Sequence, residues 1–440
     1  MAVPSNILIV GAGVFGLSTA LSLTKRHPTS QVTLLEASPT IPNPHGSSVD
    51  TSRIVRADYS NPIYARLAVE AIERWRNTEW GHEERYIQNG LLLVYPDGDS
   101  SGKDYALKSY HNVKQLEGNN VELLASEKDV LRVAPAFGPN LGVSGGYINW
   151  GSGWSNAEES VRYAKKKLDA EGRVRVQTGE VNRLLFGDAT DKRKVTGVVL
   201  SDGSSLTADL VILATGAWTA KLIDLRGRAV STGQALAYMH ITDDEQRRLA
   251  HMPTILNFST GMFILPPRNN LLKIACHAYG YINTKPAPVP GAKNGQLANI
   301  SLPDVDVPIP KAAEQEFRLA LKQLVPSIAD RPFCKTRVCW YTDTPEGDFI
   351  VTHHPDYSGL FVATGGSGHA YKFFPVLGDK VVDALEGTLD KELRDSWAWP
   401  APVDEATFFG TEDGSRAGPK GMHLTEELAK DKKAQRTSTL

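Results

Sequence analysis

Three glycines near the start of the chain have the spacing of a phosphate-binding turn. Gly11, Gly13 and Gly16 follow directly after the apolar run Ile7–Val10. In such a turn the first glycine permits a tight bend, the second admits a pyrophosphate close to the backbone, and the third lets helix and strand pack closely. Glu36 stands 20 residues after Gly16, where a carboxylate can accept hydrogen bonds from a ribose. The pattern predicts a dinucleotide-binding site, without separating NAD from FAD.

Three basic residues elsewhere have neighbours that suggest chemistry. Arg53 and Arg56 are three apart and can share one face of a helical turn, and arginine binds a carboxylate through two parallel hydrogen bonds. Lys273 lies within Leu272–His277, flanked by apolar residues as in a partly buried strand. Near a reduced flavin its cation would stabilise superoxide as an electron passes to O2. The alternatives are a solvated arginine pair and an edge-strand lysine that points to water.

The three cysteines, Cys276, Cys334 and Cys339, are irregularly spaced. Their number and spacing favour neither a disulfide framework nor a zinc site, and they suit a reducing compartment. Cys339 opens the segment Cys-Trp-Tyr-Thr-Asp-Thr-Pro. A thiolate there can add to the 8α-methyl group of an oxidised flavin and leave a thioether. The alternative is a small buried core cysteine.

A second glycine-rich turn spans Thr364–Lys372 and follows an apolar run. Gly366, Gly368 and His369 lie in it, and a turn of this kind brings backbone close to a flat cofactor. Lys372, at its end, is a candidate for holding a substrate carboxylate. The alternative is an ordinary loop between a strand and a helix.

The elements that must position these residues have α/β signals. Residues 6–36 predict strand, tight turn, helix and strand. Ser155 and Glu158 form a predicted capping box at the start of a later helix, which Gly172 ends. The run Val195–Leu200, with the tight turn that follows it, predicts a hairpin.

Strong strand–turn–helix signals return after a proline-rich middle region, so the cofactor domain is predicted to be discontinuous. Three kinds of segment are expected: an FAD-binding domain, a substrate domain and a flexible, charged tail. The FAD-binding domain is expected to cover 1–90, 150–230 and 331–400. The substrate domain is expected to cover 91–149 and 231–330, and the tail 411–440.

The composition is that of an ordinary globular enzyme. Of 440 residues, 41% are hydrophobic and 22% charged, and the formal net charge is -2. This balance gives no reason to expect a nucleic-acid partner. We expect no membrane span, because no segment reaches about 18 uninterrupted apolar residues, and no metal site.

Taken together, these segments resemble the family of monomeric sarcosine oxidase, pipecolate oxidase, fungal saccharopine oxidase and the amadoriases (fructosyl amino acid oxidases). The resemblance covers about residues 5–390. It implies an α/β fold in which an FAD-binding Rossmann-like domain is joined to a substrate domain built on a mixed or antiparallel sheet. It also implies FAD linked covalently to Cys339. The implied reaction oxidises an amine to an imine, which hydrolyses, while O2 becomes H2O2.

The same resemblance implies roles for individual side chains. Lys273 corresponds to the oxygen-activating lysine, and Arg56 with Lys372 corresponds to the pair that holds the substrate carboxylate. Arg53 corresponds to a cation beside the flavin. The remaining members of the site are active-site wall residues, namely His277, Tyr341 and His369.

The substrate class is the least determined feature. Tyr341 and Thr342 favour a secondary amino acid of the sarcosine, pipecolate or saccharopine type, whereas Gly145–Tyr147 and Gly153–Trp154 also resemble fungal amadoriases. A pyridine-nucleotide dehydrogenase would leave the Cys339 segment unexplained, a flavin hydroxylase would consume NAD(P)H, and an inactive scaffold would need no carboxylate-binding cations. We expect a monomer with an amino acid substrate and O2 as its small-molecule partners. The chain ends in Ser-Thr-Leu without the basic residue of a peroxisomal signal, so a cytoplasmic or peroxisomal location is expected.

Overall fold

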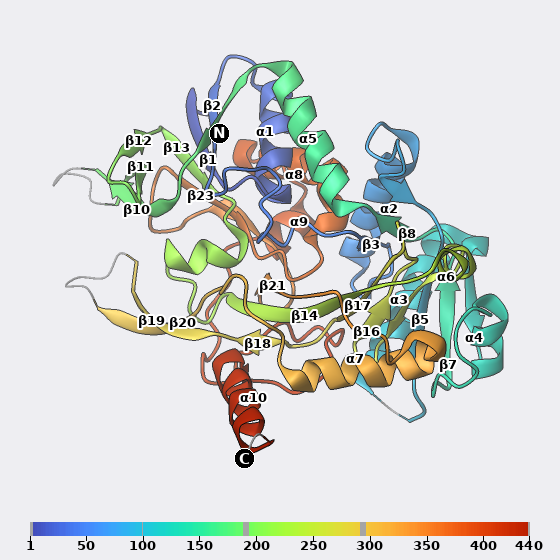
Figure 1. Ribbon diagram of the computed structural model, residues 1–440. Helices are drawn as coiled ribbons and strands as arrows, with labels where there is room; N and C mark the ends of the chain where they lie inside the picture. Colours follow the sequence, from blue (N-terminus) through green and yellow to red (C-terminus); the bar gives the residue numbers. More distant parts are fainter. Residues whose placement is uncertain (1–2, 99, 188–192, 291–295, 439–440) are drawn as a thin grey trace.

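The computed structural model describes residues 3–98, 100–187, 193–290 and 296–438. Two large sheets organise the chain (Figure 1). One carries the glycine-rich turn near the N-terminus, and the other carries Lys273 and Cys339. The expected α/β class, with a second sheet of mixed direction, is confirmed.

The first sheet has six strands, and all are parallel except the edge strand β22, which runs antiparallel to β23. The spatial order is β22 (Ile350–His353), β23 (Leu360–Thr364), β13 (Leu210–Leu213), β1 (Asn6–Val10), β2 (Gln31–Glu36) and β9 (Val174–Thr178). Segments from four distant parts of the sequence thus meet in one layer. The carboxyl ends of β1, β13 and β23 lead into the turns that form the candidate site.

The alternation of side chains along β1 explains how this sheet is covered on both faces. Ile7 and Ile9 belong to the core beneath the helices, whereas Leu8 and Val10 belong to a core on the opposite face. Helix α1 (Val14–Arg26) packs between α5 (Ala157–Glu171) and α8 (Phe374–Glu386). The opposite face is covered by a small sheet of β10 (Val181–Phe186), β11 (Val195–Leu200) and β12 (Ser205–Thr207), in which β11 and β12 form the expected hairpin.

The second sheet has ten strands and follows a mixed pattern of directions. Its order is β24 (Met422–His423), β18 (Tyr281–Ile282), β14 (Val230–His240), β17 (Leu271–Cys276), β16 (Met262–Ile264), β15 (Thr254–Asn257), β5 (Leu91–Tyr95), β7 (Gly145–Asn149) and β6 (Val121–Leu124), with β21 (Lys335–Asp343) also paired to β14. Strand β21, which carries Cys339, therefore joins this second sheet, although the sequence grouped residues 331–400 with the FAD-binding segments. The long antiparallel pairing with β14, from Val230↔Asp343 to Tyr238↔Lys335, holds it there.

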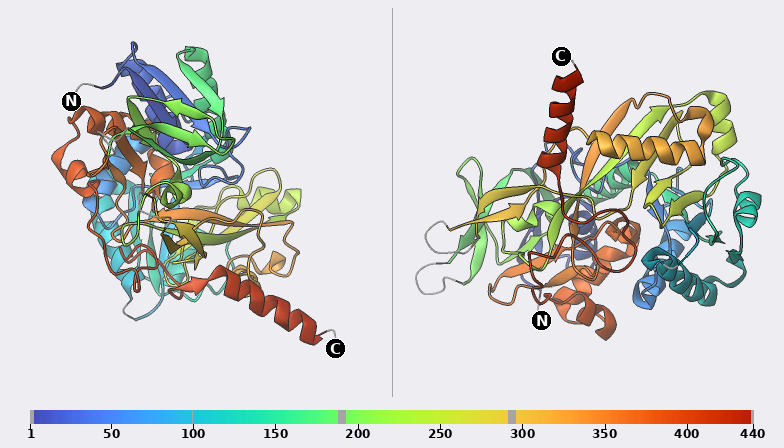
Figure 2. Two further views of the ribbon diagram at one scale, coloured as in Figure 1. Left: turned by 90° about the vertical axis from the view of Figure 1, so that its left-hand side faces the viewer. Right: turned by 90° about the horizontal axis from the view of Figure 1, so that it is seen from below.

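Helices complete the layers around the second sheet. Helix α7 (Lys311–Leu324) places Phe317 and Leu321 in the core on one face. The other helices have these bounds: α2 (Pro62–Asn77), α3 (Ser101–Glu117), α4 (Glu127–Val133), α6 (Asp243–Leu249), α9 (Lys391–Ser396) and α10 (Leu424–Ser438). A two-stranded ribbon, β19 (Thr284–Pro288) with β20 (Leu297–Ser301), extends from the body (Figure 2). Within the described ranges, no helix is both long and apolar enough to cross a membrane.

Two local predictions are corrected. Arg53 and Arg56 do not share a helical turn, because β3 (Arg53–Val55) is a strand that pairs with β8 (Gly153–Ser155), which in turn pairs with β4 (Tyr86–Ile87). Helix α5 is capped by Asn156, whose side chain accepts from the N–H of Glu159, and not by Ser155. The hydroxyl of Ser155 instead contacts the hydroxyls of Ser160 and Tyr371.

The expected flexible tail from residue 411 is also corrected. Thr411, Ser415 and Arg416 are buried at 2%, 4% and 5% exposure. The chain then adds β24 to the second sheet, and α10 projects from the body (Figures 1 and 2). The charged composition suggested solvation, but the buried side chains find partners in the interior.

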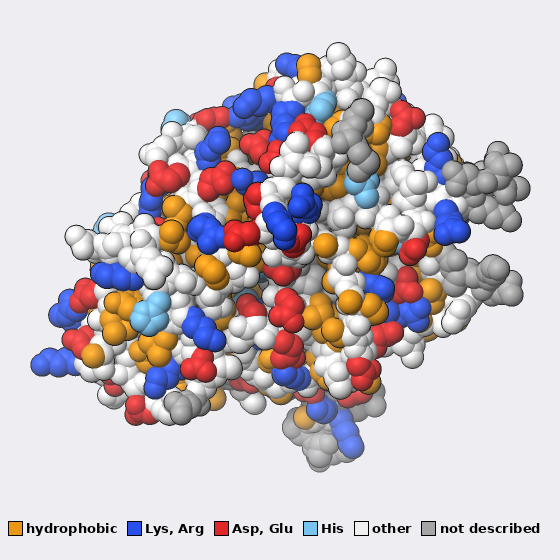
Figure 3. Space-filling view, turned by 180° about the vertical axis from the view of Figure 1, so that it is seen from behind, with side chains coloured by type: hydrophobic (Ala, Val, Ile, Leu, Met, Phe, Trp, Pro, Cys, Tyr) orange, Lys and Arg blue, Asp and Glu red, His pale blue; other side chains and the backbone are white. Residues whose placement is uncertain are grey.

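The surface agrees with a nearly neutral chain. Lysine and arginine are interspersed with aspartate and glutamate on the face opposite to that of Figure 1 (Figure 3). Mixed charges of this kind produce no large field of one sign.

Candidate functional site

The first glycine-rich turn is shaped by close backbone contacts. Gly11 adopts φ +102°, and a Cβ there would collide with the carbonyl of Ala214 at the end of β13. A Cβ at Gly13 would meet Ser48 Oγ, and one at Gly16 would collide with the carbonyl oxygen of Gly11. At each of these three positions the turn leaves no room for a side chain.

A cleft of about 700 Å³ opens beside this turn. It lies at the carboxyl ends of the parallel strands, where α/β proteins bind their ligands. The predicted residues that line it are Gly11, Gly13, Glu36, Arg53, Tyr341, Gly366, Gly368 and His369. Two turns more than 350 residues apart in sequence therefore face one cavity.

Glu36 anchors the edge of the cleft through its carboxylate. Oε2 accepts from the N–H of Ala12 at 2.8 Å, and Oε1 accepts from the N–H of Ser38 at 3.0 Å and from Asn43 Nδ2 at 2.9 Å. These contacts fix the carboxylate at the end of β2, directly beside the glycine turn.

A buried ion network beside the cleft joins the second large sheet to residues 50–53, which lead into β3. Asp50 Oδ2 lies 2.7 Å from Lys273 Nζ and 2.6 Å from Arg53 Nη1, while Oδ1 accepts from Tyr238 Oη at 2.6 Å. Burial by itself would raise the pKa of Asp50, but Lys273 and Arg53 lower it below its usual range. Burial lowers the pKa of Lys273 to about 8, since Asp50 offsets only part of the desolvation.

Cys339 lies against this network. Its Sγ is 3.4 Å from Arg53 Nη2, and the side chain is 1% exposed. Cys339 and Tyr341 point to the same face of β21 because they are two residues apart in a strand. Because Tyr341 lines the cleft, the Cys339 sulfur lies on the face of the sheet that is turned toward the cleft. Burial raises the pKa of Tyr341 to about 12, which keeps its phenol protonated.

Arg56 and Lys372 both contact Tyr59. The guanidinium carbon of Arg56 lies 4.8 Å from the centre of the Tyr59 ring, and Lys372 Nζ lies 5.0 Å from it. Both side chains are buried, at 5% and 4% exposure. Arg56 Nη1 is buried without a hydrogen-bond partner among the described residues. An unpaired buried N–H of a guanidinium is costly, so this position suits an anionic ligand.

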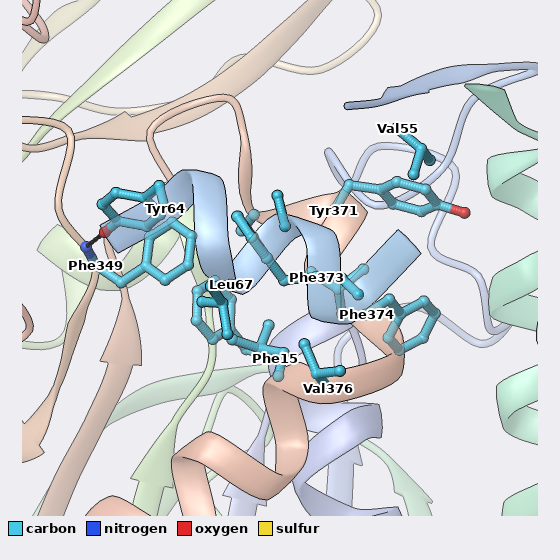
Figure 4. Close-up of a cluster of buried hydrophobic side chains, with 14 of the residues drawn as sticks. Phe15, Val55, Tyr64, Leu67, Phe349, Tyr371, Phe373, Phe374 and Val376 are labelled. Carbon is cyan, nitrogen blue, oxygen red and sulfur yellow. Dashed lines mark hydrogen bonds between the residues drawn. The ribbon is translucent and has the colours of Figure 1, made fainter. Parts of the chain in front are cut away.

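An aromatic cluster fixes the turn that carries Lys372. Phe373 packs against Tyr64, with ring centres 5.9 Å apart, and Tyr371 packs against Phe374 and lies beside Val55 (Figure 4). The backbone carbonyl of Lys372 itself accepts from Trp75 Nε1 at 2.7 Å. The backbone is therefore rigidly held on both sides of Lys372, and its side chain is directed to Tyr59.

His277 reaches the site through the C-terminal segment. Its Nδ1 lies 3.4 Å from Arg416 Nη1, while Arg416 Nη2 binds Asp343 at 2.7 Å and the carbonyl of Ser367 at 3.0 Å. The Arg416 guanidinium also lies 5.3 Å from the Tyr341 ring. Burial and the cation of Arg416 hold the pKa of His277 well below its usual value, so the imidazole is neutral.

The predicted residues thus fall into two connected groups. Gly11, Gly13, Gly16 and Glu36 lie around the turn after β1 and the end of β2, and the other members lie around the second glycine-rich turn, the ion network and Arg416. Lys273, Cys339, Arg56, Lys372 and His277 are not among the residues that line the cleft. Cys339 contacts Arg53 and Lys372 contacts the carbonyl of His369, and both of these partners line it. Lys273, Arg56 and His277 reach lining residues through Asp50, Tyr59 and Arg416, respectively.

Sequence reasoning missed Asp50, Tyr59 and Arg416. Asp50 and Tyr59 flank the predicted arginines, and that proximity was the available signal. Arg416 lies in a polar stretch in which no pattern indicated burial.

Comparison with known proteins agrees with this geometry. The family described as FAD dependent oxidoreductase (DAO) matches residues 6–384. The chain belongs to this family. An amino acid oxidase of Aspergillus flavus, imqH, is 32% identical over 88% of this chain and 93% of its own length. The L-saccharopine oxidase of Schizosaccharomyces pombe is 27% identical over 90% of this chain and 93% of its own.

Solved structures give the same result for the fold. The fructosamine oxidase Amadoriase II of Aspergillus fumigatus superimposes with a TM-score of 0.84 at 27% identity and covers 97% of both chains. A fructosyl peptide oxidase from E. terrenum gives a TM-score of 0.85 at 26% identity, over 97% of this chain and 98% of its own. As a member of the DAO family, the chain is an FAD-dependent oxidase of amines or amino acids.

The residues present fit FAD. Gly11 and Gly13 line the cleft at the carboxyl end of β1 and would hold the pyrophosphate, Glu36 in the same lining would hold a ribose, and Arg53 and Tyr341 line the cleft next to the buried cations. Bound FAD supplies a ring that accepts two electrons from an amine and passes them to O2. The chain holds the cofactor and substrate and controls the charges around them.

Proposed function

We propose that the enzyme oxidises the C–N bond of a secondary amino acid of the sarcosine, pipecolate or saccharopine type. The products are an imine, which hydrolyses, and H2O2 formed from O2. The observation that carries this proposal is the unpartnered Nη1 of buried Arg56 beside Lys372. A carboxylate at this point would satisfy Arg56 and lie between two basic side chains.

The other predicted roles belong to the same proposal. FAD would be linked covalently through Cys339, which is supported by the common facing of Cys339 and Tyr341 on β21. Lys273 would assist the reaction with O2, which is supported by its burial and its link through Asp50 to Arg53. Gly366, Gly368 and His369 would contact the cofactor, because they line the cleft. A monomeric state and a cytoplasmic or peroxisomal location stay predictions.

An amadoriase acting on fructosyl amino acids is the second candidate. The close superposition with amadoriase structures favours it. A panel of sarcosine, pipecolate, saccharopine and a fructosyl amino acid, read by H2O2 release, distinguishes the two. We expect turnover of at least one of the first three, with Arg56→Ala raising its KM. Turnover of the fructosyl compound alone would establish the second candidate.

A further inference from the structure

Lys372 is a buried amine that lacks a counter-ion. Its Nζ donates to Tyr59 Oη at 2.7 Å and to the carbonyl of His369 at 2.8 Å. In the described part of the chain, no carboxylate oxygen lies within 4.0 Å of it, whereas Lys273, the other buried lysine of the site, has Asp50 at 2.7 Å. The two lysines therefore differ in how a positive charge would be balanced.

The hydrogen bonds of His369 determine which groups donate and which accept in this network. His369 Nε2 lies 2.7 Å from the carbonyl oxygen of Gly347, which can only accept, so Nε2 carries the proton. Burial, together with the cations of Arg56 and Arg416, holds the pKa of His369 well below its usual value, and the ring is neutral. Nδ1 then accepts from Tyr59 Oη at 2.9 Å, and Tyr59 Oη accepts from Lys372.

This arrangement accounts for two protons on Lys372 and not for a third. A neutral amine has two N–H groups, and both have acceptors, Tyr59 Oη and the His369 carbonyl. An ammonium group has three, and buried donors without partners are costly. A bound carboxylate would be the third acceptor.

The charges around Lys372 also favour its uncharged form. Arg56 is a permanent cation that also contacts the Tyr59 ring. Asp58 is the acid that opposes it, but its carboxylate is held by Ser152 Oγ at 2.6 Å and Asn149 Nδ2 at 3.2 Å. Burial first, and then Arg56, hold the pKa of Lys372 well below its usual value, and Asp58 offsets this only in part. The tyrosines and histidines around them are uncharged, namely Tyr59, Tyr105, His277 and His369.

We propose that Lys372 is an uncharged amine in the empty site and gains a proton when a carboxylate ligand binds. With an amino acid substrate, the proton comes from the substrate's own ammonium group. One N–H bond breaks on the substrate nitrogen and one forms on Lys372 Nζ, and no electron moves. The transfer leaves a neutral amine, whose lone pair is required for oxidation, beside a carboxylate held by two cations. This inference rests on the proposed function, because it needs the carboxylate site at Arg56.

Proton uptake on binding tests the inference. Holoenzyme is titrated calorimetrically at pH 7 with methoxyacetate, a carboxylate without an amine, in buffers of different ionisation enthalpy. We expect uptake of about one proton per site, since binding is linked to one protonation. Binding of 2-aminoisobutyrate, a zwitterion without an α-hydrogen to lose, should take up none, because its ammonium supplies the proton.

Two variants make the result specific. Lys372→Arg, which is always charged, should bind methoxyacetate without proton uptake, and Lys372→Met should bind it at least tenfold more weakly. Binding by the wild type that depends on Arg56 but takes up no proton would overturn the inference and leave the proposed function standing. Failure of methoxyacetate to bind, or binding unaffected by Arg56→Ala, would overturn the carboxylate site and the inference together.

Discussion

Lys273 Nζ and Asp50 Oδ2 lie 2.7 Å apart in the interior, although 223 residues separate them in sequence. Their side chains are 3% and 0% exposed. Asp50 also binds Arg53 at 2.6 Å, so one carboxylate balances two buried cations, one on β17 and one on β3. This relationship controls both the stability of the site and the charge of Lys273.

Asp50→Asn should destabilise the fold, because it leaves Lys273 and Arg53 without their counter-charge. Removing one partner of a buried ion pair costs about 3–5 kcal/mol. Urea denaturation of wild type and variant measures the change. Asp169→Asn is the control, since the exposed pair of Asp169 with Lys165 should contribute little. Equal effects of the two substitutions would contradict the role given to Asp50.

The charge on Lys273 should give the oxidase a pH dependence. Burial lowers the pKa of Lys273 to about 8, so the cation is present below that pH and lost above it. If the cation assists the reaction with O2, the rate of flavin reoxidation should fall about tenfold per pH unit above about 8. Stopped-flow reoxidation measures this. Lys273→Arg should remove the step, and an unchanged profile in that variant would assign the step to another group.

The lowered pKa of Lys273 also affects stability, and here the effect increases with pH instead of decreasing. The folded value, about 8, lies below the ordinary value of 10.5, so the unfolded chain binds more protons between them. The contribution of Lys273 to the free energy of unfolding should therefore rise with pH from about 8 to 10.5. Comparing wild type with Lys273→Met over this range isolates that contribution, and parallel curves would contradict it.

Arg56→Ala should weaken the binding of carboxylate ligands more than it affects folding. Hydrogen bonds to charged groups contribute about 1.5–3 kcal/mol, which corresponds to about a 10- to 150-fold rise in the Kd of methoxyacetate. Calorimetry with holoenzyme measures this. Arg66→Ala is the matched control, because Arg66 is exposed and pairs with Glu392 at the surface. An unaltered Kd in Arg56→Ala would place the carboxylate elsewhere.

Arg416→Met should show that the segment after residue 410 belongs to the folded body. It leaves Asp343, which is 0% exposed, without its cation and should cost about 3–5 kcal/mol of stability. Lys420→Met, in the same segment but in an exposed pair with Glu412, is the control and should have little effect. Thermal or urea unfolding compares the two, and similar stabilities would contradict the structural role of Arg416.

Cys339→Ala should convert a covalently held flavin into a released one. The absorbance of wild-type protein should stay with the pellet after acid precipitation, and that of the variant should appear in the supernatant. Cys276→Ala is the control and should behave as wild type, because Cys276 Sγ bonds the carbonyl of Thr260 at 3.4 Å, away from Arg53. Flavin released from the wild type would remove Cys339 from this role.

The sequence by itself determined the features that depend on neighbours along the chain. The glycine turn, the apolar strand before it and Glu36 at the end of the next strand follow from local sterics and from the period of side chains. The family resemblance likewise rests on short ordered motifs, and the match over residues 6–384 confirms it.

The tertiary structure alone decided which distant groups share a charge or a hydrogen bond. Two residues three apart, such as Arg53 and Arg56, share a face in a helix but not in a strand. Only the pairing of β3 with β8 shows that this segment is a strand. Asp50 with Lys273 and Arg416 with Asp343 are pairs of distant segments, and no local pattern encodes such contacts. Burial turned charged residues of ordinary appearance into a site with shifted pKa values, because desolvation depends on what the whole fold places around a side chain.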